Sequence, residues 1–423
     1  MKFAFVTPRY GADIGSGPEH ACRLIAEQVS ERHDVDVLTT CARDPRTWRN
    51  EYSEGADRIR GVLVRRFSVS QTHDRTSFNQ LTSRLATAPH GREDEIEWVR
   101  RLGPWTPGLI EHLKRQQRSY DAIIFFGASH PTTVHGASVA PDRSIIFPYL
   151  QWHPALRFGL WTELLSSVRG IGLFCEAERA LLRKYIRIPA GSDEVVGIGI
   201  DPPPQQSYPR HQLDPADDLP IDDDLPADDD AAVDDSPLDA RGAPFRRRHR
   251  LYGTVALYGG RVEADNGCEE MLQYFDTYAA SNGDTTLVLM GVKMMKVPEE
   301  PYLRLAGVLP ERERMVAYEA ADLTIAPASY DLLAQPLLES FAVGTPVLAS
   351  AANPASVGHC RRANAGLYYS NADEFADAMR LLTSNRRLCE LLGENGRRYV
   401  QQHYRWDSVL GRFDRLVARI KSR

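Results

Sequence analysis

Strongly apolar runs alternate along the chain with helical patterns, and this alternation restricts the fold more than any other feature. Runs such as AIIFFG (122–127) and TTLVLMG (285–291) are apolar at almost every position. Strands of that kind are buried on both faces, as in parallel sheets covered by helices. Helical periodicity fills the gaps, for example over 19–32 and 386–403. The sequence therefore predicts an α/β protein made of doubly wound, Rossmann-like sheets.

A segment of very different composition divides the chain. Residues 201–240 contain thirteen aspartates, eight prolines and one arginine. Such a segment buries too little apolar surface to offset its ordering entropy, so we interpret it as a disordered acidic linker, with a partner-binding or self-masking tail as the alternative. We expect a first domain over 1–200, a second over 241–405 with a ligand cleft between them, and a C-terminal helix over 406–423 that can cross back to the first domain.

Charge and composition exclude several classes of protein. Outside the linker, 44 acidic and 50 basic residues give a charge of +6, which suits a small anionic ligand and is too weak to indicate nucleic acid. No apolar run reaches about 18 residues, and the N-terminus lacks a signal-peptide pattern. The six cysteines form no C-x-x-C pair, which argues against a zinc site or a disulfide framework. We expect a cytoplasmic protein without a bound metal. Weak contact with the inner membrane face, through basic clusters such as RRRHR (246–250), is a further hypothesis.

A glycine-bearing loop follows the first predicted strand. Gly15 and Gly17 precede a helix whose free amides can meet an anion, although a plain connecting turn is the alternative. The dinucleotide pattern G-x-G-x-x-G fails because His20 stands where its third glycine belongs, so a nicotinamide enzyme is disfavoured.

Two further stretches lie at strand ends in the second half. Arg261 follows the strand that ends in Gly259-Gly260, and an arginine there can grip a phosphate bidentately. In YDLLAQPLLESFAVGTPVLAS (330–350), Asp331 and Glu339 lie on either side of a helix start. A carboxylate at that place can accept hydrogen bonds from two vicinal sugar hydroxyls. The alternatives are a surface ion pair, a turn former and a solvated helix acid, but the apolar neighbours of Glu339 favour a functional role.

These stretches together resemble a known family. Arg261 before a helix, and two acids separated by seven residues on the frame LLES-F-A-V-G-T-P-V, are similar to the retaining GT-B glycosyltransferases of the large family 4, also called group 1. The resemblance covers nearly the whole chain outside 201–240. It implies two Rossmann-like domains facing a cleft, no cofactor and no metal. It also implies a nucleotide-diphosphate sugar donor, a glycan, lipid-linked or small-molecule acceptor, and transfer with retention of configuration.

The resemblance also assigns roles to individual residues. Arg261 would bind the donor diphosphate, Glu339 the ribose hydroxyls, and Asp331 would lie near the donor sugar. The backbone of Val308 and Leu309 would contact the base. The remaining donor contacts would come from the first-domain loop and from the helix start around the second acid, namely Gly15, Gly17, Ala334, Gln335 and Leu338.

Several positions depart from the family pattern. Asn266 stands where a lysine usually stabilises the leaving diphosphate, and losing such a donor can lower the rate about 10²–10³-fold. The first acid is usually glutamate rather than Asp331, and Pro336 removes an amide near the phosphates. The alternative function is therefore a catalytically degenerate GT-B protein that binds nucleotide or sugar as a non-catalytic partner. A GT-B epimerase or phosphorylase is a third hypothesis.

A catalytic histidine is expected after the fifth strand of the first domain. Gln151 stands at about that place and His153 lies two residues further on, so His153 is the candidate. We interpret His130 and His135, in SHPTTVHG, as packing or acceptor contacts, because their spacing matches no metal site.

Overall fold

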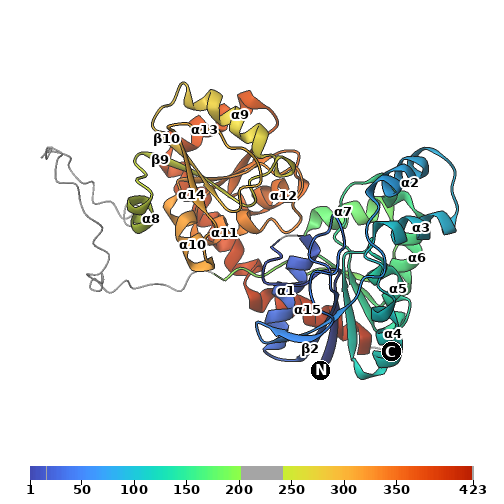
Figure 1. Ribbon diagram of the computed structural model, residues 1–423. Helices are drawn as coiled ribbons and strands as arrows, with labels where there is room; N and C mark the ends of the chain where they lie inside the picture. Colours follow the sequence, from blue (N-terminus) through green and yellow to red (C-terminus); the bar gives the residue numbers. More distant parts are fainter. Residues whose placement is uncertain (16, 202–241, 422–423) are drawn as a thin grey trace, which may run out of the picture.

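The protein is described by a computed structural model covering residues 1–15, 17–201 and 242–421. The disordered linker predicted over 201–240 therefore lies, apart from its first residue, outside the described residues. Figure 1 shows two α/β domains side by side, each with helices on both faces of its sheet. No helix of the described part is long and apolar enough to cross a membrane.

The first domain contains an eight-stranded sheet in the order β3-β4-β2-β1-β5-β6-β7-β8. Every pairing is parallel except that of β3 with β4. The strands are β1 (Lys2–Val6), β2 (Asp34–Thr40), β3 (Gly55–Ile59), β4 (Val62–Phe67), β5 (Ala122–Phe126), β6 (Ser144–Phe147), β7 (Gly170–Leu173) and β8 (Asp193–Val195). The helices are α1 (Gly17–Ser30), α2 (Arg75–Thr87), α3 (Arg92–Leu102), α4 (Pro107–Gln116), α5 (Pro131–Ala137), α6 (Gly159–Ser167) and α7 (Glu176–Tyr185).

The second domain contains a six-stranded, fully parallel sheet in the order β11-β10-β9-β12-β13-β14. Its strands are β9 (Thr254–Gly259), β10 (Thr285–Met290), β11 (Leu303–Gly307), β12 (Leu323–Ala326), β13 (Val347–Ser350) and β14 (Gly366–Tyr369). Its helices are α8 (Ala243–Arg248), α9 (Cys268–Ala279), α10 (Glu311–Ala320), α11 (Gln335–Val343), α12 (Pro354–Ala363), α13 (Ala372–Ser384) and α14 (Arg386–His403). The predicted architecture of two Rossmann-like domains is confirmed.

Each sheet reverses its strand order at one point, and these two points indicate where a candidate ligand site lies. The reversal falls between β1 and β5 in the first domain and between β9 and β12 in the second. Open α/β sheets bind ligands outside the carboxyl ends of the strands at such a switch point. The chain segments that follow these four strands are therefore the candidates for the functional site.

Some elements were not predicted from the sequence. The edge strand β3 has no buried residue, so it lacks the apolar pattern of the central strands. Helices α2 and α3 bury only two and three residues each, and most of their surface is polar. Because these elements form at the margin of the first domain, hydrophobic periodicity gives little indication of them.

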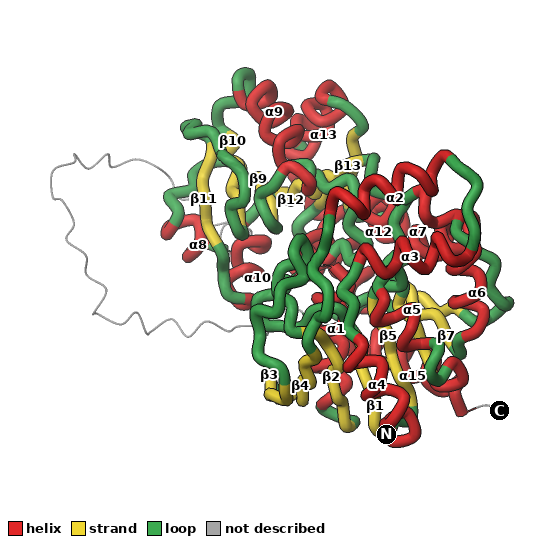
Figure 2. Tube along the Cα trace, turned by 45° about the vertical axis from the view of Figure 1, so that its right-hand side comes forward, coloured by secondary structure: helices red, strands yellow, loops and turns green. Residues whose placement is uncertain are grey.

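The last helix, α15 (Trp406–Lys421), packs on the first domain rather than on the second (Figure 2). Phe413 of α15 lies edge-on to the ring of Phe3 and is stacked on that of Phe5, with centroid distances of 6.1 and 6.2 Å. Trp406 lies so close to Gly199 that a Cβ atom at that glycine would come within 2.1 Å of its ring.

We expect Gly199→Ala to destabilise the protein by about 1–3 kcal/mol, because the added methyl group forces the Trp406 ring and the start of α15 to move. Chemical unfolding measures the change. Gly159→Ala is the matched control, since a Cβ there meets nothing within 4 Å. Equal stability of the two variants would show that the contact between α15 and the first domain contributes little to the free energy of unfolding.

Candidate functional site

The two switch points face each other across the junction between the domains. His20 Nε2, in the first turn of α1, lies 2.7 Å from Gln335 Oε1 at the start of α11. The hydroxyl of Tyr330, in the loop after β12, donates to the Leu150 carbonyl at 2.9 Å. These contacts bring the N-terminal turns of α1 and α11 together, one from each domain.

The start of α1 leaves open space where a ligand can approach. A Cβ atom at Gly15 would meet no atom of the described residues, apart from its chain neighbours, within 4 Å. Gly17 begins the helix with a φ of +72°, a conformation that favours glycine. Behind them, Arg9 Nε donates to Glu19 Oε1 at 2.9 Å, which fixes the buried Glu19 carboxylate under the first turn.

The start of α11 is shaped by Asp331. Its carboxylate accepts a hydrogen bond from the Leu333 amide at 3.1 Å, and a second amide, that of Ala334, also points to it. Burial raises the pKa of Asp331, and these two amides oppose that rise. Ala334 itself has a φ of +45°. The Ala334 amide is therefore directed at Asp331, whereas the amide of Gln335, the first helical residue, has no partner within the helix.

Glu339 is more completely paired than the sequence suggests. Arg314 of α10 donates from Nη2 to Oε1 at 2.7 Å and from Nε to Oε2 at 3.0 Å, and Gln335 Nε2 donates to Oε1 at 2.8 Å. Burial raises the pKa of Glu339, although Arg314 and Gln335 both lower it. Since a carboxylate offers about four lone-pair sites, roughly one remains for a ligand hydroxyl rather than two.

His20 extends this network into the first domain. Its Nδ1 accepts from Arg23 Nη2 at 3.2 Å, so Nε2 carries the proton and donates to Gln335. Burial lowers the pKa of His20 to about 4, helped by the positive charges of Arg23 and Arg314. The neutral imidazole thus joins the domains through a continuous chain of hydrogen bonds that runs from Arg23 to Glu339.

The depressed pKa of His20 predicts an acid sensitivity of this junction. Because the folded pKa lies below the ordinary value of 6.5, the stabilisation is complete above pH 6.5 and is lost as the pH falls through about 4. We expect the free energy of unfolding to drop by up to about 3 kcal/mol more in the wild type than in His20→Gln over this interval. Urea unfolding at pH 6.5 and pH 4.5 tests it, and parallel pH profiles of the two proteins would contradict it.

Arg261 follows β9, which is hydrogen-bonded to β12, so it lies at the same edge of the sheet as Asp331 and α11. Its exposed guanidinium pairs with Glu263 at 2.8 Å. Its carbonyl accepts from Tyr258 Oη at 2.7 Å and from Asn266 Nδ2 at 2.9 Å. Asn266 therefore fixes the turn after β9 and uses one of its amide protons on the backbone.

The structure places His153 and His130 after neighbouring strands, and only one of these strands borders the switch point. His153 follows β6, one strand beyond the switch point, where its Nδ1 accepts from the Ala155 amide and its ring lies 5.9 Å from that of Trp98. His130 follows β5, the strand beside β1, and its Nδ1 lies 2.8 Å from the Gly103 carbonyl. Nδ1 is therefore the donor and Nε2 an acceptor, and burial lowers the pKa of the ring. His130, rather than His153, occupies the switch point.

The remaining residues that were predicted to bind the sugar donor differ in their exposure to solvent. Val308 is 70% exposed just beyond β11, with the half-buried Leu309 beside it, two strands from β9. Leu338 is fully buried in the core and has no exposed side chain to offer a ligand. The switch points thus gather Gly15, Gly17, Arg261, Asp331, Ala334, Gln335 and Glu339, while His153 and Leu338 lie apart.

Three residues of this junction were missed or set aside by the sequence analysis, namely His20, Arg314 and His130. In the sequence, His20 was considered only as the residue that stands in place of the third glycine of G-x-G-x-x-G. Arg314 is one of several charged residues in PERERM. The signal that could have found His130 was its place after a buried strand, but only the strand order shows that this strand borders β1.

The fold and this arrangement define a class of proteins. Sucrose-phosphate synthase from Thermosynechococcus elongatus is similar over 100% of this chain and 99% of that chain, with a TM-score of 0.65 and 15% identity. The Anabaena protein HepE in complex with UDP and glucose is similar over 100% of both chains, with a TM-score of 0.66 and 13% identity. The E. coli trehalose-6-phosphate protein bound with UDP-2-fluoroglucose gives a TM-score of 0.63 at 12% identity over 100% and 99%. The chain therefore has the GT-B fold of glycosyltransferases.

The second domain also matches a known protein family in sequence. Residues 244–399 match the family described as glycosyl transferases group 1. The second domain is thus similar in sequence to the group 1 glycosyltransferases, as the resemblance implied. No curated protein matches the chain in sequence.

Proposed function

We propose that the protein transfers a sugar from a nucleotide-diphosphate donor to an acceptor hydroxyl, with retention of configuration. The observation that carries the proposal is the 2.7 Å contact between His20 and Gln335, which joins the N-termini of α1 and α11 at the domain junction. Two positive helix ends brought together favour an anion between them. Arg261, just after β9, the strand beside β12, adds a third positive group on the second-domain side.

Each part of the donor has a matching group. The diphosphate would meet the Gln335 amide and Arg261, which would exchange its partner Glu263 for phosphate oxygens. A ribose hydroxyl would bind the free lone pair of Glu339, whose orientation Arg314 fixes. His130 Nε2 would accept from a hydroxyl of the donor sugar. The exposed backbone around Val308 would border the base.

In the transfer itself, the bond between the anomeric carbon and the diphosphate breaks, and its electron pair leaves with the phosphate oxygen. The acceptor oxygen bonds to the anomeric carbon on the same face, and its proton passes to the departing phosphate. Neither acid at the junction is free as a base, because Asp331 is held by amides and Glu339 by Arg314. This supports retention, since inversion requires a positioned base.

Titration calorimetry with UDP, GDP and ADP tests donor binding, and UDP is the first choice because the HepE structure contains it. NMR of UDP-glucose hydrolysis then tests turnover and stereochemistry. We expect UDP to bind and glucose to appear first as the α anomer, the configuration of the donor. Absence of binding for all three nucleotides would overturn the proposal, and β-glucose as the first product would overturn retention.

One observation favours the second hypothesis, a non-catalytic nucleotide-binding partner. Asn266 carries no charge, and its side-chain amide already donates a hydrogen bond to the Arg261 carbonyl. It therefore does not replace a lysine at the leaving diphosphate. UDP binding without hydrolysis of any donor sugar would support this alternative.

A further inference from the structure

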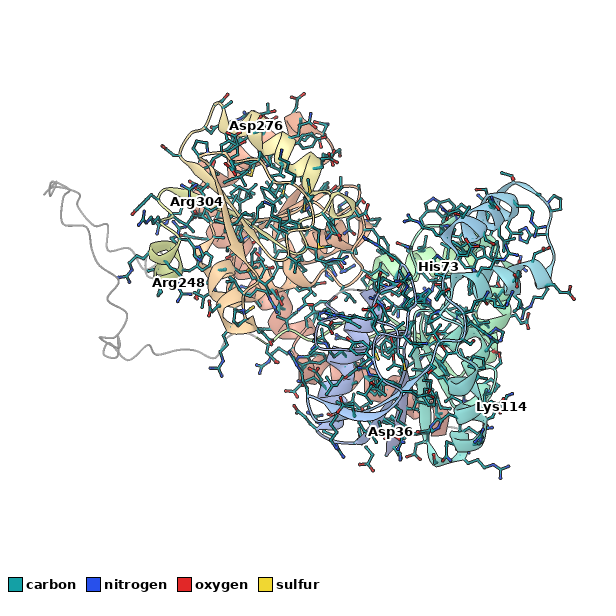
Figure 3. All side chains as sticks on the ribbon, viewed as in Figure 1. Asp36, His73, Lys114, Arg248, Asp276 and Arg304 are labelled. Atoms are coloured by element: carbon teal, nitrogen blue, oxygen red, sulfur yellow. The ribbon has the colours of Figure 1, made fainter. Side chains whose placement is uncertain are left out.

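A polar pocket of 170 Å³ lies in the first domain, outside the donor site described above. It opens between the loop after β4, the start of α2 and the end of α3. Figure 3 labels His73 of this pocket in the upper half of the first domain and Lys114 in its lower half. The residues that matter for its chemistry are Trp48, Gln71, His73, Glu97, Arg100 and Arg101.

The polar groups of the pocket are held in place by one another. Arg100 binds both oxygens of Glu97, with Nε at 2.7 Å and Nη2 at 3.1 Å, and Arg101 Nε reaches the same carboxylate at 2.7 Å. Arg100 Nη1 donates to Gln71 Oε1 at 3.2 Å, and Arg101 Nη1 donates to Ser77 Oγ at 2.7 Å. The side chains are thus pre-organised, which lowers the entropy cost of binding a ligand.

The balance of charge and hydrogen-bonding groups indicates the kind of ligand. Arg100 and Arg101 are matched by Glu97 and by Asp74, which also lines the pocket, so these four side chains carry no net charge. His73 Nδ1 lies 3.0 Å from the Arg101 carbonyl and donates to it, so Nε2 is an acceptor. Donors and acceptors alternate at short range, which suits hydroxyl groups that both donate and accept. A phosphate would need an excess of positive charge, and a lipid chain would need an apolar lining.

The pocket shares a wall with the switch point of the first domain. The Trp48 ring lies 5.8 Å from that of His130, whose Nδ1 bonds the carbonyl of Gly103, another lining residue. On its other side, a Cβ at Gly127 would come within 3.1 Å of His130 and 3.4 Å of Pro18 at the start of α1. The side chains of Trp48, which is buried, and His130 therefore stand between the pocket and Pro18 at the start of α1.

We propose that this pocket binds a neutral sugar unit of the acceptor, so that the acceptor is a glycan whose reacting end extends past Trp48 and His130 to the donor. The inference rests on the proposed function, because it names the substrate of the same transfer. The volume lies below the roughly 300–1,000 Å³ of common ligand sites, so the pocket holds one ring of a larger acceptor.

Saturation-transfer NMR with methyl glycosides of glucose, galactose, mannose and N-acetylglucosamine tests the proposal on the full chain. We expect at least one glycoside to bind the wild type in the presence of UDP. Arg100→Ala removes a charged group bonded to Glu97 and Gln71, and it should weaken that binding about tenfold or more. Lys114→Ala, which breaks an exposed helical ion pair with Glu111 in the same domain, should leave it unchanged.

Thermal unfolding and UDP titration accompany each variant, and both should match the wild type. The proposal is overturned if no glycoside binds the wild type or if Arg100→Ala binds as tightly as the wild type. Failure of the proposed function is a separate result, since it shows as absent UDP binding whether or not a glycoside occupies the pocket.

Discussion

Replacing Arg261 by alanine is expected to lower the rate of UDP-glucose hydrolysis by roughly 10²–10³-fold. The reason is the loss of the guanidinium that follows β9 at the switch point, where charge develops on the departing diphosphate. Because Asn266 brings no positive charge to this place, Arg261 carries more of the stabilisation than it would beside a lysine. Initial rates with saturating donor measure the effect.

Glu263→Gln is the matched control for this variant. It keeps the guanidinium but removes the carboxylate that lies 2.8 Å from Arg261 in the unliganded arrangement. Hydrolysis by the control should equal or exceed that of the wild type, because phosphate no longer competes with Glu263. A rate in Arg261→Ala within threefold of the wild type would show that this arginine does not act on the diphosphate.

The second large effect is expected at the pair formed by Arg314 and Glu339. Breaking a buried pair from one side leaves a charge without its partner, so Arg314→Leu should destabilise the protein by about 3 kcal/mol. Replacing both residues by leucine removes both charges and should cost less than that single change. Urea unfolding of the wild type, the two single variants and the double variant measures the coupling.

The same variants separate stability from nucleotide binding. Without Arg314, burial raises the pKa of Glu339 still further, so the stability of Arg314→Leu is greatest at low pH and falls as the pH rises through that pKa. The double variant should recover stability but not UDP affinity, because the ribose acceptor is gone. UDP binding by the double variant at wild-type affinity would exclude Glu339 from the ribose site.

The sequence predicted the fold where burial leaves a local pattern. Central strands of the two sheets, such as β5 and β10, consist mostly of apolar residues because both faces are covered by helices. The edge strand β3 was missed because it is exposed. The local apolar pattern therefore predicts the buried central strands of each domain, but it does not predict exposed elements at the edge of the sheet.

The sequence also predicted part of the candidate site, but from the composition of single loops rather than from burial. Residues close to a strand end in the chain, such as Arg261 and Asp331, were found because the loop itself is distinctive. The position of His130 at the switch point could not be predicted, because it depends on β5 lying beside β1, which is a property of the whole sheet. The pairing of Arg314 with Glu339 joins residues 25 positions apart on different helices, and no spacing rule predicts it.

Hydrogen exchange of the first-turn amides of α1 and α11, with and without UDP, tests the central claim most directly. If the diphosphate lies between the two helix starts, UDP should slow exchange at Glu19 and His20 in the first domain and at Gln335 and Leu337 in the second. Unchanged exchange at both helix starts when UDP is bound at saturation would place the nucleotide elsewhere and contradict the account.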